Sequence, residues 1–445
     1  MIMTAIKKVT NYLVKDTSIL PLAIFRMAFG FLMCFSMIRF IYNGWIEKCY
    51  TNPEFHFTYQ FFNWIQPFNV KGMYFIVVLS AISALCIGLG LLYRIATILF
   101  FISFTYLELI EKSWYLNHYY FVSLVAFLLI LVPANRNFSF DVKLFSRKKL
   151  NTVPNWSVHI FKLQLAVVYI FGGIAKLNSD WLVNAQPLAI WLKAKTNVPV
   201  IGWLLNNDIA PYLFSWSGML YDLTIPFLLF IKKTRPIAYL FVIIFHILTY
   251  LLFNIGMFPW LMIFGSLIFI THAEWNNILF FIDKKIPQHT NKTNYKSKPI
   301  LLGFLTLFFC FQFLFPLRSH FLTNNVLWTE NGFRFSWHVM IMEKNGSAEF
   351  TVIDKLNNKR WKEYPKKYLT NIQETQMSFQ PDMIWQYAQF LKEEYAKKGI
   401  MDVAVFVDAR VSLNGRVSQK FINPKKDLTT LAAIDEVYNY VLKLN

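Results

Sequence analysis

The sequence predicts an α-helical polytopic membrane protein with about nine transmembrane helices and a C-terminal β-rich, α+β domain outside the membrane. Three observations support this fold class. Hydrophobic residues make up 56% of the 445 residues and the mean hydropathy is +0.39, so the chain is more apolar than a typical soluble protein. Long apolar runs recur up to residue 316, and from residue 317 the composition becomes more polar and strand-like. We therefore expect a transmembrane domain at 1–316 and an extramembrane domain at 317–445.

The apolar runs define the predicted spans, because about 20 consecutive apolar residues cross a bilayer as a helix. Several runs are shorter than this, so their ends are approximate. Glycines inside the runs, such as Gly30, Gly172 and Gly173, are common in membrane helices because small residues allow close packing. The predicted spans are 20–41, 73–92, 95–110, 116–133, 160–177, 212–231, 236–253, 257–271 and 299–316.

Basic residues concentrate in every second loop between these spans. If the N-terminus is cytoplasmic, the cytoplasmic loops carry many Lys and Arg residues and the outer loops carry few, as the positive-inside rule requires. This predicts an extracytoplasmic C-terminal domain and active site. The net charge of +19 then follows from membrane topology, and nucleic acid is not expected as a partner. The predicted cytoplasmic basic residues are Lys7, Lys8, Lys15, Arg94, Arg136, Lys143, Arg147, Lys148, Lys149, Lys232, Lys233, Arg235, Lys284, Lys285, Lys292, Lys296 and Lys298.

The region after residue 317 contains two strand-rich segments, each with an Asn-Gly dipeptide, which favours a tight hairpin turn. These dipeptides lie at 345–346 and 414–415. Between them, residues 381–399 have the pattern of an amphipathic helix that ends in glycine. In the membrane region, residues 181–211 are too apolar for a free outer loop. We expect them to form interfacial or re-entrant pieces that line a cavity.

Polar residues at the predicted outer ends of the spans mark a candidate site, because ionisable groups in membrane segments are costly and face a cavity or a partner. Asn117, His118, Lys176 and Asn254 are expected at similar depth, with the C-terminal domain covering them. Lys176 follows an apolar run and has no acid within the preceding helical turn. A lysine kept neutral by burial can act as a base. The amide and the imidazole can orient a hydroxyl or stabilise an oxyanion.

Simpler explanations stand beside this hypothesis. A lysine at a helix end commonly extends to the membrane interface, and a single histidine there is often a packing residue. Asp222 and Arg39 are more often an ion pair than catalytic groups, and His246 is either a packed core residue or part of the site. The four cysteines show no metal-binding spacing, so no metal is expected.

Several long motifs resemble the vitamin K-dependent γ-glutamyl carboxylases, in the order in which that family carries them. SWYLNHYYF (113–121), YIFGGIAKLNSDWL (169–182) and FHILTYLLFNIGMFPW (245–260) resemble membrane segments of the family. LWTENGFRFSWHVMIMEKNG (327–346) and VFVDARVSLNGRVSQKFINPKKDL (405–428) resemble its outer domain. The chain length and the basic loops resemble those of a bacterial member.

The resemblance implies an enzyme that oxidises reduced vitamin K, a menaquinol- or phylloquinol-like compound, with O2 to an epoxide. It also implies that CO2 is added to the γ-carbon of a peptide glutamate. The lipid bilayer, the lipid-soluble quinol and a glutamate-containing peptide are then the partners. By their places in the motifs, Lys176 matches the base, and His118 and Asn117 match the pair near the quinone oxygen. The implied quinone-binding residues are His246, Asn254, Met257 and Phe258, and the implied glutamate- or peptide-binding residues are Arg334, Trp337, Met340 and Lys344.

The chain departs from the animal members of this family in two ways. Ala175 replaces the first of two adjacent lysines, which leaves Lys176 as the single candidate base at this helix end. The animal enzymes join an outer loop to the outer domain through a disulfide. Here Cys49 has no cysteine partner in that domain, and Phe390 stands at the matching position. The resemblance therefore implies that the two domains dock through packing alone.

Three functions are compatible with these motifs. The first is the coupled carboxylase, the second a quinol epoxidase or other quinol oxidoreductase without peptide carboxylation, and the third a non-enzymatic quinone-binding or peptide-maturation membrane protein. The outer domain distinguishes the first two, because a carboxylase must hold a glutamate carboxylate beside the quinol. Candidate positive partners for that carboxylate are Arg334, Lys344 and Arg410.

Overall fold

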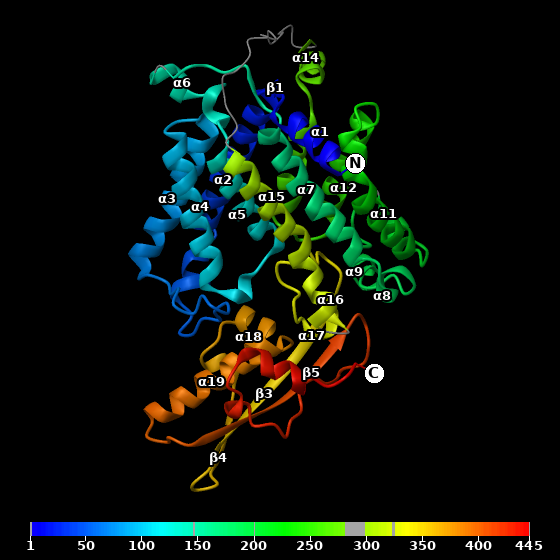
Figure 1. Cartoon of the computed structure of the whole chain (residues 1–445). Coiled ribbons are helices and arrows are strands. Elements are labelled where there is room, and N and C mark those ends of the chain that lie inside the picture. The colour runs from blue at the N-terminus through cyan, green and yellow to red at the C-terminus, as the bar shows by residue number, and fades with distance from the viewer. Residues whose placement is uncertain (1, 146, 200, 281–298, 323–324, 445) are drawn as a thin grey trace.

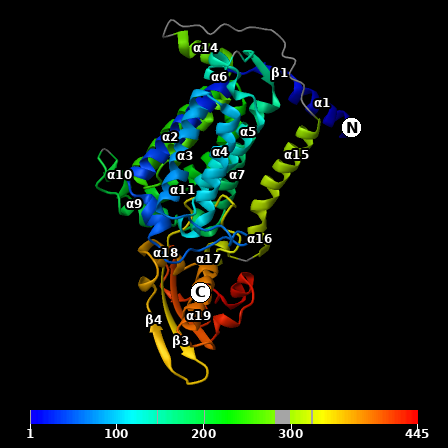
Figure 2. The same cartoon turned by 90° about the vertical axis from the view of Figure 1, so that its left-hand side faces the viewer.

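The computed structural model describes residues 2–145, 147–199, 201–280, 299–322 and 325–444 of the chain. A bundle of long helices forms one part of the molecule, and a smaller domain built on a β-sheet extends from one end of it (Figures 1 and 2). We call residues 325–444 the sheet domain. The N-terminal helix lies at the far end of the bundle, and the C-terminus lies in the sheet domain.

Among the described residues, seven helical segments are long and apolar enough to cross a membrane. Two further predicted spans form shorter apolar helices, α5 (Asn117–Leu131) and α13 (Phe258–Gly265), the latter continued by a 3-10 turn to Phe269. The predicted polytopic fold is thus confirmed, with two of the expected spans shorter than a full bilayer crossing. The long segments are α2 (Leu20–Tyr42), α3 (Val70–Leu89), α4 (Tyr93–Ile110), α7 (Trp156–Ala175), α11 (Ala210–Phe230), α12 (Arg235–Leu252) and Pro299–Leu322, which comprises α15 (Pro299–Leu314), a 3-10 turn and α16 (Arg318–Leu322).

Short elements close the end of the bundle that faces away from the sheet domain (Figure 1). Basic residues expected on the cytoplasmic side gather at this end, among them Lys7 in α1 and Lys143 in α6. The predicted basic residues Lys284, Lys285, Lys292, Lys296 and Lys298 lie outside the described residues. The closing elements are α1 (Ile2–Val14), the antiparallel pair β1 (Asp16–Ser18) and β2 (Thr152–Pro154), α6 (Phe140–Leu144) and α14 (His272–Phe280).

Helices α2 and α3 approach each other closely at two glycines. A Cβ atom on Gly30 would lie 2.2 Å from the backbone nitrogen of Gly88, so the contact requires glycine at position 30. Arg26, about one helical turn earlier, is fully buried and donates to the carbonyl oxygens of Ile87 (2.7 Å) and Gly88 (3.2 Å). Arg26 therefore satisfies carbonyl groups that lack a partner at the end of α3.

The apolar outer segment 181–211 forms short helical pieces. They border a cavity described below, which Trp181, Leu188 and Trp191 line. The prediction of irregular pieces around a cavity is therefore confirmed for the described part of this segment. The pieces are α8 (Ser179–Leu182), α9 (Leu188–Lys193) and α10 (Gly202–Leu205).

The sheet domain contains an antiparallel sheet with the strand order β4-β3-β5-β6. Alternate residues of β5 are buried, and the long helix α19 packs on the sheet, where Tyr387 contacts the ring of Phe350 (centroids 4.8 Å apart). The predicted helix over 381–399 and the β-rich character of this region are confirmed. The elements are β3 (Lys344–Asp354), β4 (Arg360–Glu363), α18 (Asn371–Met377), α19 (Pro381–Lys397), β5 (Val403–Leu413) and β6 (Gln419–Lys420), preceded by α17 (Val326–Thr329).

One of the two Asn-Gly dipeptides forms the predicted turn, and the other does not. Asn414 (φ 51°) and Gly415 (φ 79°) connect β5 to β6. Asn345 and Gly346 instead lie inside β3 and pair with β5, so the hairpin predicted there is wrong. A Cβ atom on Gly346 would lie 2.9 Å from the carbonyl oxygen of Ser378. This glycine therefore permits a close backbone approach and does not form a turn.

The sheet domain docks on the bundle through polar contacts as well as apolar packing. Lys112, just after α4, forms an ion pair with Asp382 of α19 (2.6 Å). Asp180 of α8 forms another with Arg416 (2.6 Å). The expectation of docking through packing alone is therefore wrong, because polar side chains of the outer loops find partners in the domain. Phe390 does contribute packing, because its ring centroid lies 4.6 Å from that of Phe55 in the loop before α3.

Candidate functional site

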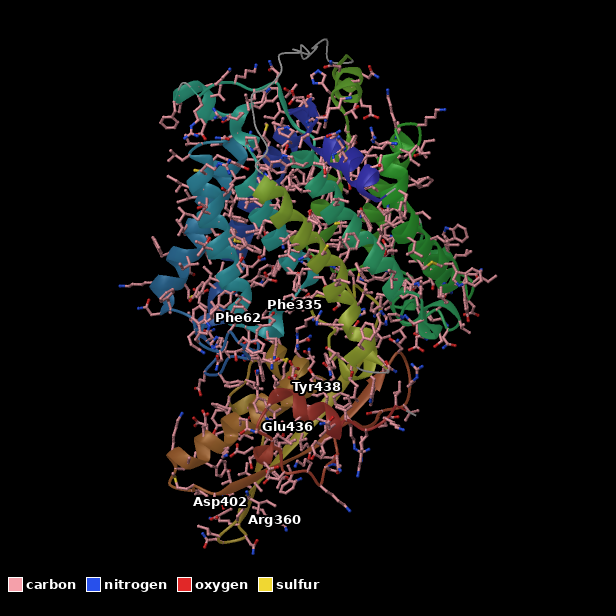
Figure 3. All side chains as sticks on the ribbon, in the orientation of Figure 1. Phe62, Phe335, Arg360, Asp402, Glu436 and Tyr438 are labelled. Atoms are coloured by element: carbon pink, nitrogen blue, oxygen red, sulfur yellow. The ribbon has the colours of Figure 1, made fainter. Side chains whose placement is uncertain are left out.

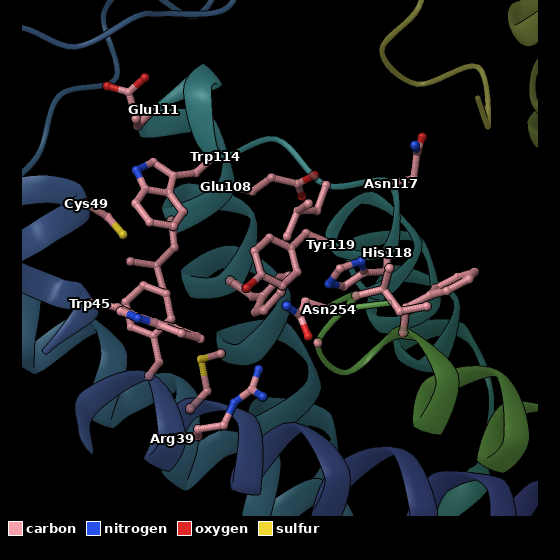
Figure 4. A pocket seen from close by; sticks show the side chains of 18 of the residues that line it. Arg39, Trp45, Cys49, Glu108, Glu111, Trp114, Asn117, His118, Tyr119 and Asn254 are labelled. Atoms are coloured by element: carbon pink, nitrogen blue, oxygen red, sulfur yellow. The ribbon is translucent and has the colours of Figure 1, made fainter. Parts of the chain in front are cut away.

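Two adjacent cavities lie where the helix bundle meets the sheet domain. The smaller one, of about 90 Å³, is the lysine cavity and contains Lys176. The larger one, of about 360 Å³, is the Asn117 cavity (Figure 4). Four residues line both cavities. One lies in the loop before α13, one is the first residue of α13, and two come from the sheet domain. This shared wall consists of Ile255, Phe258, Val339 and Met340.

Lys176 follows the last residue of α7 and is buried, with 6% of its surface exposed. Its Nζ atom lies 2.7 Å from Oδ2 of Asp222 on α11 and donates to the carbonyl oxygen of Gly172 (3.0 Å). The ring centroid of Trp181 lies 5.3 Å from Nζ. The lysine therefore faces an apolar cavity, but it has an acidic partner. Asp222 pairs with this lysine and not with Arg39, so the ion pair considered for Asp222 and Arg39 is wrong.

His246 of α12 also lines the lysine cavity. Its Nε2 atom lies 3.0 Å from the hydroxyl of Tyr169, and 1% of its surface is exposed. Its Nδ1 atom is buried and has no hydrogen-bond partner among the described residues. One ring nitrogen therefore remains available to a ligand, because buried polar atoms are normally paired.

Asn117 and His118 form the start of α5 and line the Asn117 cavity. Asn117 donates from Nδ2 to the carbonyl oxygen of His338 (3.1 Å) and accepts from the hydroxyl of Tyr115 (2.9 Å). The ring of His118 lies 5.9 Å from that of Phe258 in the shared wall. One hydrogen bond to the sheet domain and one from Tyr115 thus fix the position of this amide.

The segment that brings the sheet domain into the wall has an unusual backbone. Phe335 (φ 62°), Trp337 (φ 61°) and Met340 (φ 52°) adopt the left-handed conformation that residues other than glycine seldom adopt. Trp337 is fully buried and stacks on Tyr120 of α5 (centroids 5.0 Å apart). Figure 3 shows Phe335 at the junction of the bundle and the sheet domain. Strain of about 1–3 kcal/mol per residue persists only where the surroundings impose it, and it concentrates at functional sites.

Arg334 and Lys344 line a third cavity of about 260 Å³, the outer cavity, which lies between the sheet domain and the loop after α4. Each has an acidic partner. Arg334 lies 2.8 Å from Asp382, and Lys344 lies 2.9 Å from Glu330. Burial lowers the pKa of Lys344, although Glu330 opposes the shift. Tyr115 lines the same cavity, so the Tyr115–Asn117 hydrogen bond links the outer cavity to the Asn117 cavity.

The structure therefore distributes the predicted site residues over three neighbouring cavities instead of one pocket. Two of the predicted residues, Met257 and Trp337, are buried packing residues and line none of these cavities. Arg410 lies on β5 beside Asp408, with about half of its side chain exposed. The remaining residues are Lys176 and His246 in the lysine cavity, Asn117, His118 and Asn254 in the Asn117 cavity, Phe258 and Met340 in the shared wall, and Arg334 and Lys344 in the outer cavity.

Sequence reasoning missed the partnership of Lys176 with Asp222 and the linking position of Tyr115. An acid inside an apolar window was the available signal for Asp222. The pattern does not tell which cation on another helix the acid meets. Tyr115 gave no signal, because a tyrosine near a membrane boundary is common. Within the described ranges, no group of three or more His, Cys, Asp or Glu side chains is arranged to hold a metal ion.

Two family models match the chain, and together they cover most of it. The HTTM domain matches residues 14–275. The lumenal domain of vitamin K-dependent gamma-carboxylase matches residues 297–445. No solved structure is a significant match. The lumenal description agrees with a C-terminal domain outside the cytoplasm, and the apolar helices make the chain a membrane protein. With an HTTM domain followed by this lumenal domain, the chain belongs to the vitamin K-dependent gamma-carboxylase family.

Proposed function

We propose that this protein carboxylates the γ-carbon of glutamate in a peptide substrate and couples that step to epoxidation of reduced vitamin K. The quinol and O2 supply the oxidising chemistry: one oxygen atom enters the epoxide and the other leaves as water. At the glutamate, the γ-carbon–hydrogen bond breaks, a carbon–carbon bond forms with CO2, and the proton passes to solvent. The N-terminus is cytoplasmic, and the active site and sheet domain are extracytoplasmic.

One observation carries this proposal: a buried lysine and the Asn117–His118 pair line adjoining cavities whose common wall comes partly from the lumenal-type domain. The Asn117 cavity falls in the size range of small-molecule sites, and its lining is mostly apolar and aromatic, which suits a naphthoquinol ring. The lysine cavity is too small for such a ring by the same comparison. Phe258 and Met340 separate the two cavities, so proton transfer to Lys176 requires these side chains to move.

Lys176 acts as the base that removes a hydroxyl proton from the quinol. Its partner Asp222 makes the pair, and not the lysine alone, the unit that takes up the proton. Asn117 and His118 bind and orient the quinone oxygen. His246, Asn254, Met257 and Phe258 shape the ring site, Met257 by packing behind the residues that touch the ring.

The glutamate carboxylate is held on the sheet-domain side by Arg334 and Lys344, with Trp337 and Met340 shaping the approach. These cations are already paired with Asp382 and Glu330, which weakens their attraction for a further carboxylate. That pairing is the observation that favours the second candidate function, a quinol epoxidase without peptide carboxylation.

The test uses purified protein in nanodiscs with reduced vitamin K or menaquinol, O2, bicarbonate and a short glutamate peptide. Epoxide and peptide mass are read together by mass spectrometry. We expect both products from the wild type, and Lys176→Ala should lower both rates by about 100-fold or more. Lys162→Ala, which removes another lysine of α7 far from the cavities, is the matched control.

Each outcome of this experiment decides between functions. An active Lys176→Ala enzyme would rule out the proposed base. Epoxide without carboxylated peptide would establish the epoxidase. If folded wild-type protein yields no epoxide, the non-enzymatic quinone-binding or peptide-maturation role replaces both.

A further inference from the structure

Arg39 is a cation without an acidic partner inside the Asn117 cavity. It lies near the domain-facing end of α2 and lines the cavity. Its guanidinium lies 5.2 Å from the ring centroid of Trp45, but it has no ion pair or hydrogen bond to any other residue that the structure describes. Its Nε atom is buried and unpaired.

The fully buried basic residues of the membrane helices are paired, whereas Arg39 is half-buried and its guanidinium has no acidic partner among the described residues. Arg26 donates to backbone carbonyl groups, Lys176 pairs with Asp222, and Arg235 pairs with Glu274 (2.8 Å). A guanidinium cannot lose its proton in a protein, and an uncompensated charge away from water is costly. An arginine whose unpaired guanidinium lines a cavity is therefore expected to meet its counter-charge in a ligand.

The surroundings of Arg39 indicate what that ligand is. In Figure 4 its guanidinium points toward the part of the cavity where Tyr119, Asn254 and His118 lie. Aromatic rings make up much of the cavity lining. A flat aromatic ligand fits such a lining, and an oxygen anion on it fits the arginine.

Two acids also line this cavity. Glu111 accepts hydrogen bonds from Gln373 (2.8 Å) and from backbone nitrogens. Glu108 accepts from Ser123 through Oε2 (2.8 Å), and its Oε1 atom is buried without a partner among the described residues. Neither approaches Arg39 within ion-pair distance among the described residues, and Figure 4 shows Glu111 on the far side of the cavity. The end of the cavity at Arg39 is therefore positively charged.

We propose that Arg39 makes the Asn117 cavity selective for planar aromatic ligands that carry a negative charge on oxygen. Under the proposed function, on which the ligand's identity rests, this ligand is the deprotonated naphthoquinol. Arg39 binds the oxygen that has lost its proton and so favours the form on which O2 acts. The selectivity is a property of binding and does not require turnover.

The test compares two probes of nearly the same shape, 2-hydroxy-1,4-naphthoquinone, which is anionic near pH 7, and its neutral 2-methoxy analogue. Tryptophan fluorescence of the full chain in detergent reports binding, because Trp45 and Trp114 line the cavity. We expect the wild type to prefer the anionic probe by about tenfold or more. Arg39→Gln should remove that preference while the neutral probe binds as before, and Arg39→Lys should keep part of it. Arg136→Gln, at the opposite end of the bundle, is the control.

Several results would overturn the inference: equal affinity of the wild type for both probes, no binding of either, or an unchanged preference in Arg39→Gln. Thermal unfolding of Arg39→Lys beside Arg39→Gln separates loss of charge from loss of folding. If the wild type prefers the anionic probe but forms no epoxide, the proposed function is wrong and the anion site is supported. If the wild type forms epoxide but does not prefer the anionic probe, the anion site is wrong and the proposed function is unaffected.

Discussion

At the scale of single residues, the buried pair of Lys176 and Asp222 is the unit to consider. Both side chains are buried, and their Nζ and Oδ2 atoms are only 2.7 Å apart. Groups in such close contact influence each other's protonation, so the base strength in the proposed reaction belongs to the pair. Asp222 is in this sense a positioning residue: it aims the amine and sets the pH at which it works.

Asp222→Asn tests this role through the pH dependence of epoxidation. The amide keeps an acceptor for Lys176 but removes the negative charge that stabilises the ammonium form. We expect the acid limb of the pH–rate profile to move to lower pH by about one unit or more, with a maximal rate about 10–100-fold lower. Glu274→Gln, which alters a similar buried pair at the other end of the bundle, should leave the profile in place. A profile that does not move in Asp222→Asn would make Asp222 purely structural.

The sequence predicted candidate site residues more readily than their partners. Lys176, Asn117 and His118 stood out because polar groups in apolar windows are costly. The pairing of Lys176 with Asp222 and the isolation of Arg39 depend on how α7, α11 and α2 turn toward one another, which no single helix pattern contains. The role of each residue stays a prediction until turnover is measured.

At the scale of elements, glycines decide how closely helices and strands approach. The contact of α2 with α3 depends on Gly30, as the contact of β3 with the end of α18 depends on Gly346. Hydropathy located most helices to within a few residues, because length and apolarity fix them. The hairpin predicted at Asn345 was wrong because Gly346 is needed for a close contact with Ser378, which is distant in sequence. Local turn preferences do not contain that contact.

Gly30→Ala should destabilise the helix bundle, because its Cβ atom would lie 2.5 Å from the Cα atom of Gly88. We expect a loss of about 1–3 kcal/mol or more in unfolding free energy, from overpacking of a rigid backbone contact. Thermal unfolding in detergent measures it. Gly303→Ala in α15 is the matched control, since a Cβ atom there meets no described atom within 4 Å. Equal stability of the two variants would contradict the close contact.

At the scale of the whole molecule, Glu111 ties three segments together. Its carboxylate accepts hydrogen bonds from Phe57 in an outer loop, from Ser113 and from Gln373 of α18. Burial raises its pKa to about 7, although these hydrogen bonds oppose the shift. The folded protein therefore holds a proton here that the unfolded chain has lost between about pH 4.5 and pH 7.

The contribution of Glu111 to stability is fully present below its unfolded pKa and is lost as the pH rises to about 7. Glu111→Gln keeps the shape and cannot ionise, so its stability should fall less than that of the wild type over this interval. Between about pH 4.5 and pH 7, the wild type should lose on the order of 3 kcal/mol more unfolding free energy than Glu111→Gln. Hydrogen exchange of α18 at several pH values measures it.

The comparison with Glu111→Gln is needed because another buried group has the opposite pH dependence. Burial, assisted by neighbouring cations, lowers the pKa of His338 to about 3. Between this value and the pKa of the unfolded chain, about 6.5, only the unfolded chain binds the proton, so the stability rises with pH over this interval. Wild-type stability alone would mix the two effects. Parallel curves for wild type and Glu111→Gln would show that the carboxyl group does not titrate in this range.

The shared wall between the two cavities has a consequence for how family members diverge. Ile255 and Phe258 come from the part matched by the HTTM domain, whereas Val339 and Met340 come from the part matched by the lumenal domain. A larger side chain on one side must be accommodated by a smaller one on the other, since protein interiors tolerate little net change in volume. These positions should therefore co-vary across relatives, although more than eighty residues of sequence separate them.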